Sequence, residues 1–261
     1  MTTELVRLLS ADEPTAVEEI HGNGASPFLL VCDHAGHRVP ARIDLGIPQG
    51  ELLRHIGWDI GIAGVARALS DALDAALIMQ PYSRLVIDCN RPPGVPSSIP
   101  EASDGTKIPG NIALPPQHAE QRRIEIFEPY HRAIERHLDA RKAAGRPTIL
   151  IALHSFTPLY GGLARPWHAG VLYNRYRDLA ISLRDALRQS GELKIGDMEP
   201  YTVSDDTDYT VPVHGERRSL AHVGIEIRQD LIETASGQRQ WAARLADVLP
   251  RAAAKIGQFS R

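Results

Sequence analysis

The sequence has few cysteines, no long hydrophobic run and almost no net charge, and each of these shortages excludes a class of protein. Two of its 261 residues are cysteine, Cys32 and Cys89, and both end apolar runs, so we expect reduced core thiols rather than a disulfide framework. Apolar runs such as 28–32 and 148–153 are far shorter than the roughly 18 residues of a membrane span. The chain has 29 Lys+Arg and 32 Asp+Glu, a net charge of −3, which argues against a general nucleic-acid binder or a disordered tail.

Several enzyme motifs are also missing. The absence of GxGxxG and GxxxxGK(S/T) counts against a Rossmann or P-loop nucleotide enzyme, and HEXXH is absent too. Without GxSxG, a nucleophile-elbow hydrolase is not expected. The N-terminal segment contains acids and lacks a basic start followed by an apolar stretch, so we expect a cytoplasmic protein without a secretory signal. The sequence contains no sustained heptad, so it predicts no particular oligomeric state. We expect neither a membrane nor a nucleic acid as a partner.

Apolar runs and helical spacings alternate along the chain. Short apolar runs predict strands, and apolar residues three or four apart predict helices with one buried face. Predicted strands lie at 28–32, 76–80, 84–88, 148–153, 170–174 and 222–228, and predicted helices at 59–76, 117–144, 176–190 and 238–257. This alternation favours one α/β domain over 1–261, with a mixed, mostly parallel sheet flanked by helices on both faces. A Pro/Gly/Ser-rich stretch at 92–116 predicts a long loop, and such loops are usually functional or mobile.

Polar side chains gather where the predicted strands end. His34 and His154 each follow an apolar run, Glu226 lies in another, and Asn90 and Arg91 come just after 84–88. In an open α/β sheet such positions converge on one crevice. Two histidines and a carboxylate suit zinc with a position open for water, and a carboxylate such as Glu226 can act as general base and then general acid. An Asn-Arg pair suits a substrate carboxylate, because the guanidinium fork can bind both oxygens.

Each candidate also has a purely structural interpretation. His34 can cap a loop, and His154 can be a core histidine with satisfied hydrogen bonds. Asp59 can be a carboxylate at a helix start, where the helix dipole favours it. Arg84 and Arg91 can pair with surface acids. The residues alone therefore leave both interpretations open.

Six motifs in a fixed order cover nearly the whole chain: CDHAGHRVP at 32–40, HIGWDIGIAGVARAL at 55–69, YSRLVIDCNRPP at 82–93, ALHSFTP at 152–158, DYTVPVHGERR at 208–218 and GIEIRQDLI at 224–232. Together they resemble the N-formylglutamate amidohydrolase family, and SRLVIDCNRP followed by LHS is the most specific portion. That family is similar to the zinc carboxypeptidase and aspartoacylase group, whose mixed sheet surrounds a mononuclear zinc. The resemblance implies a zinc-carboxypeptidase-like α/β fold with one zinc per chain, and cobalt, iron or manganese would suit the same ligand types.

The resemblance also implies the metal ligands. His34 matches the first zinc ligand, and His154 matches the histidine ligand at the end of a central strand. In the carboxypeptidases a glutamate follows the first histidine by three, but His37 occupies that position here. Asp59, in the GWDIG motif that the amidohydrolase family shares, is therefore our choice for the third ligand, with His37 as the alternative.

Further matches imply the catalytic and substrate-binding groups. Glu226 matches the glutamate that activates water, and Arg84 resembles the arginine that polarises the scissile carbonyl and stabilises the oxyanion. Asn90 and Arg91 resemble the pair that holds the substrate's carboxylate. His214, in VPVHGE, matches a family histidine expected near the substrate.

The implied reaction is zinc-dependent hydrolysis of the amide bond of an N-formyl or other N-acyl amino acid, such as N-formyl-L-glutamate. Its products are formate, or another short acid, and a free amino acid. Arg228, just beyond Glu226, adds a second cation, which means either a more acidic substrate or an ion pair with Asp230 or another acid. Two alternatives stay open. One is an exopeptidase or amidase for small peptides or cell-wall fragments, selected by how far the loop at 92–116 closes the crevice; the other is a non-catalytic protein that binds small acidic ligands.

Overall fold

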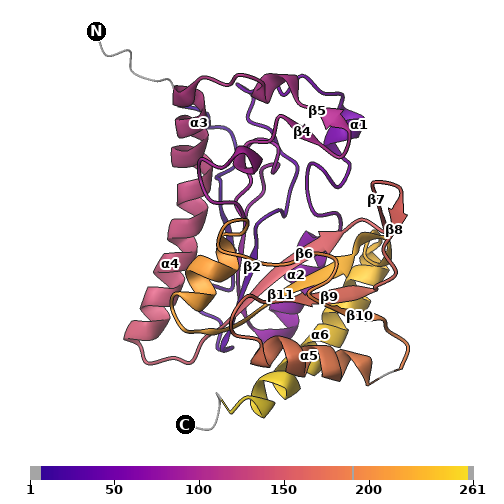
Figure 1. The fold of residues 1–261 in the computed structure, drawn as a ribbon. Helices are drawn as coiled ribbons and strands as arrows, with labels where there is room; N and C mark the ends of the chain where they lie inside the picture. Colours follow the sequence, from indigo (N-terminus) through magenta and orange to yellow (C-terminus); the bar gives the residue numbers. More distant parts are fainter. Residues whose placement is uncertain (1–6, 190, 258–261) are drawn as a thin grey trace.

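A computed structural model of the chain describes residues 7–189 and 191–257. Its centre is one seven-stranded sheet with the strand order β1-β3-β2-β6-β11-β9-β10 (Figure 1). The strands are β1 (Glu18–Ile20), β2 (Phe28–Cys32), β3 (Ala76–Met79), β6 (Ile149–Phe156), β9 (Ala169–Leu172), β10 (Ile195–Asp197) and β11 (Ala221–Arg228). Strands β3, β2, β6 and β11 are parallel, β10 is parallel to β9, and only the β1–β3 and β11–β9 pairs are antiparallel. This confirms the predicted mixed, mostly parallel sheet.

Helices cover both faces of the sheet. The helices of residues 7–189 and 191–257 are α1 (Gln49–Leu52), α2 (Ile62–Leu73), α3 (Pro116–Arg122), α4 (Glu128–Ala143), α5 (Asp178–Arg188) and α6 (Ala235–Lys255). Of these, α2, α4 and α5 contact the sheet, and α6 packs against α2 and α5. Side chains alternate between two cores along β2, because successive residues of a strand point to opposite faces: Leu30 packs with α2, α5 and α6, whereas Leu29 packs on the side of α4. Figure 1 shows α4 along one side of the sheet and α2, α5 and α6 together on the other. The predicted arrangement of helices on both faces is confirmed.

The start of α2 leaves Asp59 outside the helix. The predicted helix at 59–76 begins only at Ile62, since Gly61 has a positive φ of 79°. A Cβ on Gly61 would lie 2.2 Å from the backbone oxygen of Ile232, so only glycine fits there. The side chain of Asp59 does not cap the helix and is free to face other groups.

The segment 84–88 is not a strand, so that prediction was wrong. Its apolar side chains are buried, as in a strand, but its backbone oxygens accept hydrogen bonds from distant side chains instead of a neighbouring strand. Asn111 Nδ2 donates to the carbonyl of Leu85 at 2.8 Å, and Arg122 Nη1 donates to that of Val86 at 2.9 Å. These two buried side chains satisfy a loop that periodicity alone cannot distinguish from a strand.

Several short elements were not predicted from the sequence. Two hairpins occur, β4 (Ala102–Ser103) with β5 (Thr106–Lys107), inside the predicted loop at 92–116, and β7 (Leu159–Tyr160) with β8 (Leu163–Ala164). Short 3₁₀ helices are η1 (Pro96–Ser98), η2 (Pro109–Asn111) and η5 (Gln229–Leu231). Short π-helices are η3 (Arg123–Phe127), which joins α3 to α4, and η4 (Val211–Glu216). No helix among residues 7–189 and 191–257 is both long and apolar enough to cross a membrane. The cysteines Cys32 and Cys89 are both buried and free.

Candidate active site

A cleft of about 810 Å³ opens beyond the carboxyl ends of β2, β6 and β11. This is where ligands bind in open α/β sheets. Most of the side chains singled out from the sequence line it: His34, Asp59, Arg84, Asn90, Arg91, His154 and Glu226. The hairpin β4–β5 also contributes to the wall, so part of the segment 92–116 borders the cleft.

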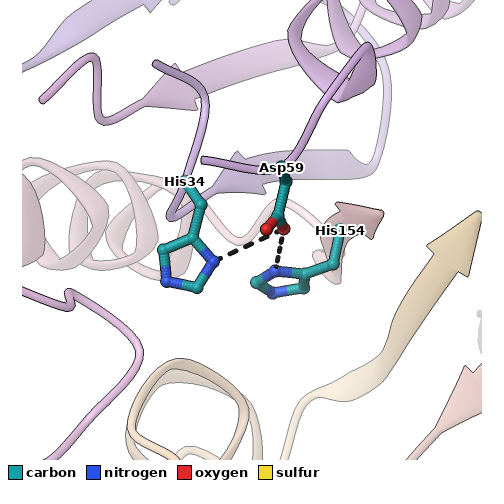
Figure 2. Close-up of side chains that lie close together, drawn as sticks. All are labelled: His34, Asp59 and His154. Carbon is teal, nitrogen blue, oxygen red and sulfur yellow. Dashed lines mark hydrogen bonds and ion pairs between the residues drawn. The ribbon is translucent and has the colours of Figure 1, made fainter. Parts of the chain in front are cut away.

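Two histidines and one carboxylate converge at the base of this cleft (Figure 2). His154 Nδ1 lies 2.9 Å and His34 Nδ1 lies 3.4 Å from the same oxygen, Oδ2 of Asp59. One ligand atom from each of the three residues lies within 4.8 Å of the other two, and all three side chains are buried. Imidazole nitrogens and a carboxylate oxygen are the donor types that zinc and related divalent ions prefer.

Backbone contacts hold these three residues together. The amide of Asp59 donates to the carbonyl of His34 at 3.0 Å, which ties the loop after β2 to the loop before α2. The amide of Ser155 donates to Asp59 Oδ2 at 3.3 Å, which ties the same carboxylate to β6. The positions of the donors are therefore fixed by three separate elements of the fold.

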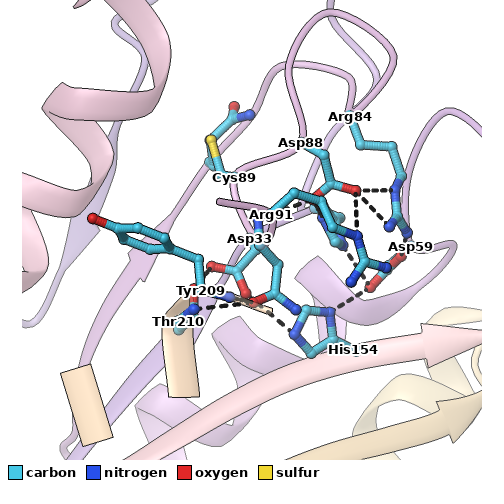
Figure 3. Close-up of polar contacts among 12 residues, drawn as sticks. Asp33, Asp59, Arg84, Asp88, Cys89, Arg91, His154, Tyr209 and Thr210 are labelled. Carbon is cyan, nitrogen blue, oxygen red and sulfur yellow. Dashed lines mark hydrogen bonds and ion pairs between the residues drawn. The ribbon is translucent and has the colours of Figure 1, made fainter. Parts of the chain in front are cut away.

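A second pair of carboxylates lies against the outer nitrogens of both rings, and Figure 3 shows Asp33 beside His154. His34 Nε2 hydrogen-bonds Asp88 Oδ1 at 2.7 Å, and His154 Nε2 lies 3.2 Å from Asp33 Oδ2. Asp33 is fully buried and its other oxygen accepts a hydrogen bond from the Thr210 hydroxyl at 2.7 Å. Carboxylates in these positions orient metal-ligating histidines and fix their tautomers. The residues present therefore fit a metal centre, with His34, Asp59 and His154 as the donor groups.

The carboxyls of this cluster stay ionised in spite of their burial. Burial alone would raise their pKa values, but the two histidines, and for Asp88 the guanidinium of Arg84, outweigh it. The pKa of Asp33 falls to about 2, and those of Asp59 and Asp88 lie below the usual range. The negative charge of these three carboxylates is balanced by Arg84 and by the two histidines, whose pKa values the same carboxylates raise.

Arg84 is fixed beside the cluster by two acids. Its Nε and Nη2 donate to Asp88 Oδ2 at 3.0 and 2.6 Å, and its Nη1 lies 3.4 Å from Asp59 Oδ1. Its side chain is only 24% exposed and faces the cleft. The structure therefore places a positive charge next to the three converging donors.

Glu226 faces the same donors from β11. It stands opposite His154 in the parallel register of β11 and β6, and it is 6% exposed. Its Oε2 has no hydrogen-bond partner in the described part of the chain. Burial raises the pKa of Glu226 to about 7. A carboxyl poised near neutrality in a cleft is suited to accept and return a proton.

Asn90 and Arg91 border the cleft and are anchored to a segment near η4. Asn90 Oδ1 accepts from the amide of Thr210 at 3.0 Å, and Asn90 Nδ2 donates to Asp208 Oδ1 at 3.2 Å. Arg91 Nη1 lies 3.5 Å from the same Asp208 oxygen and also donates to the carbonyl of Thr207. These contacts hold an amide and a guanidinium side by side in the wall.

Three residues singled out from the sequence lie elsewhere. His37 packs against the ring of Trp58, with ring centres 4.9 Å apart, and is not one of the three converging donors. His214 is fully buried behind the wall and hydrogen-bonds His131 at 2.9 Å, so it does not line the cleft near a substrate. Arg228 pairs with Asp230 at 2.7 Å, in line with the ion-pair interpretation.

Several residues of the site have no role in the sequence-based predictions. Asp33 precedes His34 directly, and Asp88 lies within the VIDCN motif, so a search for carboxylates adjacent to the candidate histidines and arginines would have found both. Arg165 and Tyr201 also line the cleft, but they lie in segments without periodicity or a shared motif. No pattern in the sequence joins them to the site.

The protein is an α/β protein with a mixed sheet. A cleft lined by histidine, carboxylate and arginine side chains lies at the carboxyl ends of its strands, where active sites of α/β enzymes are found. The model of the N-formylglutamate amidohydrolase family matches residues 26–233, and the chain belongs to this family. The family resemblance drawn from the six motifs is thereby confirmed.

Solved structures with the same fold include two that cover almost the whole chain. A gene product from Agrobacterium tumefaciens is 34% identical, with a TM-score of 0.93 over 96% of this chain and 100% of that one. The N-formylglutamate amidohydrolase from Ralstonia eutropha is 17% identical, with a TM-score of 0.67 over 92% of this chain and 98% of that one. No curated protein sequence gives a significant match.

Proposed function

We propose that the protein is a metal-dependent hydrolase of the amide bond of an N-formyl or other N-acyl amino acid, with N-formyl-L-glutamate as the first substrate to test. The observation that carries this proposal is the convergence of His34, Asp59 and His154 on one point of a cleft that also holds Glu226. Membership in the N-formylglutamate amidohydrolase family supports the amide as the bond that is cleaved.

His34 Nδ1, His154 Nδ1 and a carboxylate oxygen of Asp59 would hold the metal, for which zinc is our choice. Zinc bound by three protein ligands supplies Lewis-acid polarisation of a carbonyl and eases the ionisation of water. Asp88 keeps the His34 ring in place through its outer nitrogen, and Asp33 does so for His154. These carboxylates make both rings better donors.

Glu226 would move the proton. Its unpartnered Oε2 takes a proton from water as the water attacks the carbonyl carbon, and the same carboxyl then gives that proton to the leaving nitrogen. A pKa of about 7 suits both steps, because neither protonation state is strongly favoured at neutral pH. General acid-base catalysis of this kind contributes about 10²- to 10⁴-fold to a rate.

Arg84 would stabilise the oxyanion, and the Asn90–Arg91 pair would bind the carboxylate of the amino acid. Arg84 stands next to the donors, where the carbonyl oxygen becomes an oxyanion, and a preorganised charge at that point is worth about 3 to 4 kcal/mol. Arg91 and Asn90, held by Asp208, offer a planar cation and an amide to the carboxylate of the amino acid. The two positions orient the scissile bond between them.

A second candidate is an amidase that acts on short peptides or cell-wall fragments. The cleft volume of about 810 Å³ favours it, since clefts of roughly 300 to 1,000 Å³ hold drug-sized ligands, which are larger than a formylated amino acid. The same residues would perform the same steps. A panel of N-acyl amino acids and dipeptides distinguishes the two candidates by kcat/KM.

The test is Glu226→Gln in the metal-loaded protein. We expect formate release from N-formyl-L-glutamate to fall by about 10³-fold, while metal content and thermal stability stay close to wild type. The matched control is Gln229→Glu, an amide-to-acid exchange three residues further along the chain and outside the cleft lining. Unchanged turnover in Glu226→Gln would contradict the role of Glu226, and a wild-type protein that binds but never cleaves would favour the non-catalytic binding alternative.

A further inference from the structure

Among residues 7–189 and 191–257, the arginines that line the cleft are Arg84, Arg91 and Arg165, and Arg165 alone has no acidic partner there. Arg84 is paired with Asp88, and Arg91 lies 3.5 Å from Asp208. Arg165 forms no ion pair in residues 7–189 and 191–257, although it lies in the same cleft. An arginine without a counterion in a cleft attracts an anion from outside the protein.

Aromatic rings hold the Arg165 guanidinium in a defined place. Its Cζ lies 4.6 Å from the ring centre of Tyr160, 4.7 Å from that of Tyr201 and 6.0 Å from that of Phe156. Arg165 Nη1 also donates to the hydroxyl of Tyr201 at 2.8 Å. A guanidinium stacked on aromatic faces keeps its charge and loses side-chain freedom, so it is preorganised for a ligand.

The backbone around Arg165 is anchored as well. Arg228, at the end of β11, donates to the carbonyls of Arg165 at 3.5 Å and of Trp167 at 3.3 Å. The amide of Arg165 donates to the carbonyl of Pro158, so it closes the β7–β8 hairpin. Arg228, the second cation noted in the sequence, thus supports the segment that carries Arg165.

Donor capacity remains on Arg165 after these contacts. A guanidinium has five N–H groups in a planar fork, and within the described chain only Nη1 has a hydrogen-bond acceptor. Glu199 also borders the cleft, but within the described part of the chain it makes no ion pair with Arg165. The free Nε and Nη2 hydrogens can therefore bind the two oxygens of a carboxylate at once.

Arg165 shares the cleft with Tyr201 and with the proposed catalytic groups Arg84 and Glu226. The pKa of the Tyr201 hydroxyl is raised by partial burial and by the negative charge of Glu226, while the charges of Arg165 and Arg84 oppose this rise. Tyr201, which contacts Arg165, lines the same cleft as Glu226. Asn90 and Arg91 are anchored instead to the segment at 207–210.

We propose that Arg165, clamped by Tyr160 and Tyr201, binds a second carboxylate of the substrate and thereby selects N-acyl amino acids with an acidic side chain. This inference rests on the proposed function, in which Asn90 and Arg91 hold the first carboxylate. Arg165 is then a specificity residue that touches the substrate side chain and takes no part in the chemical step.

The experiment compares N-formyl-L-glutamate with N-formyl-L-glutamine, which has nearly the same shape without the second charge. With the metal-loaded full chain, we expect kcat/KM to favour the glutamate substrate by roughly 10- to 100-fold, the range of one charged bidentate contact. Arg165→Gln should bring this ratio close to one through a loss on the glutamate substrate alone. Arg165→Lys, which keeps the charge without the fork, should give an intermediate ratio.

A matched control is Arg132→Gln on α4, because that side chain is 59% exposed and is not part of the cleft lining. It should leave the ratio unchanged. A ratio in Arg165→Gln equal to that of wild type, or an equal loss on both substrates, overturns the proposal. Metal content and melting temperature of each variant show whether the fold is kept.

A binding measurement separates this proposal from the proposed function. Calorimetric titration of the metal-loaded protein with L-glutamate and with L-glutamine needs no turnover. Tighter binding of glutamate that disappears in Arg165→Gln supports the acidic subsite even if no N-formyl amino acid is hydrolysed, in which case only the proposed function fails. Equal binding of the two amino acids, or no binding of either, overturns the subsite.

Discussion

The replacement of Asp33 by asparagine should weaken metal binding without removing a ligand. Asp33 is fully buried, and its Oδ2 lies 3.2 Å from the outer nitrogen of His154. Asn is nearly isosteric but carries no charge, so the variant loses a charged contact of a kind worth about 1.5 to 3 kcal/mol. That energy corresponds to roughly 10- to 100-fold in Kd, which is also the range known for partners of metal-ligating histidines.

The assay is a zinc titration in competition with a chromophoric chelator at constant pH and salt. Thr210→Val is the matched control, because it removes only the 2.7 Å hydrogen bond to the other oxygen of Asp33 and keeps the carboxylate. We expect a change of less than about tenfold in this control. A zinc Kd for Asp33→Asn within twofold of wild type would refute the reasoning that Asp33 orients His154 as a ligand.

Two further predictions concern stability. Burial lowers the pKa of His131 to about 4, whereas in the unfolded chain it is about 6.5, so the unfolded state binds the extra proton between these values. The free energy of unfolding is therefore expected to fall by about 3 kcal/mol between pH 7 and pH 4 because of His131. Urea unfolding of wild type and of His131→Gln at both pH values checks this. An equal pH dependence of the unfolding free energy in the two proteins would contradict it. Gly61→Ala should lower the unfolding free energy by about 2 kcal/mol or more, since its φ of 79° and the 2.2 Å approach to Ile232 both exclude a side chain. Gly94→Ala, also at positive φ but with open space around it, is the control and should lose less.

The sequence predicted that His34 and His154 would lie close together because both follow a simple rule. His34 and His154 stand where buried strands end, and the parallel order of β2 and β6 brings such positions to one edge of the sheet. Asp59 was identified through the resemblance, and the fold explains it: Gly61 delays the start of α2 and leaves the carboxylate outside the helix. The α/β architecture was predictable for the same reason, since buried strands and amphipathic helices alternate along the chain.

Other features depend on contacts that no local pattern encodes. The segment 84–88 has the composition of a strand, and it becomes a loop only because Asn111 and Arg122 reach its carbonyls from distant parts of the chain. Arg165 acquires its position from rings on two separate segments, so its own neighbours in sequence give no sign of it. Long-range side-chain contacts of this kind are visible only in three dimensions.

Metal-dependent amide hydrolysis is tested by measuring the metal content of the purified protein together with formate release from N-formyl-L-glutamate, before and after chelation and after zinc is restored. We predict about one metal ion per chain, loss of formate release on chelation and recovery with zinc. A protein that takes up no metal even when zinc is supplied would contradict the assignment of His34, Asp59 and His154 as ligands. Formate release that persists in the fully metal-free protein would contradict the mechanism itself.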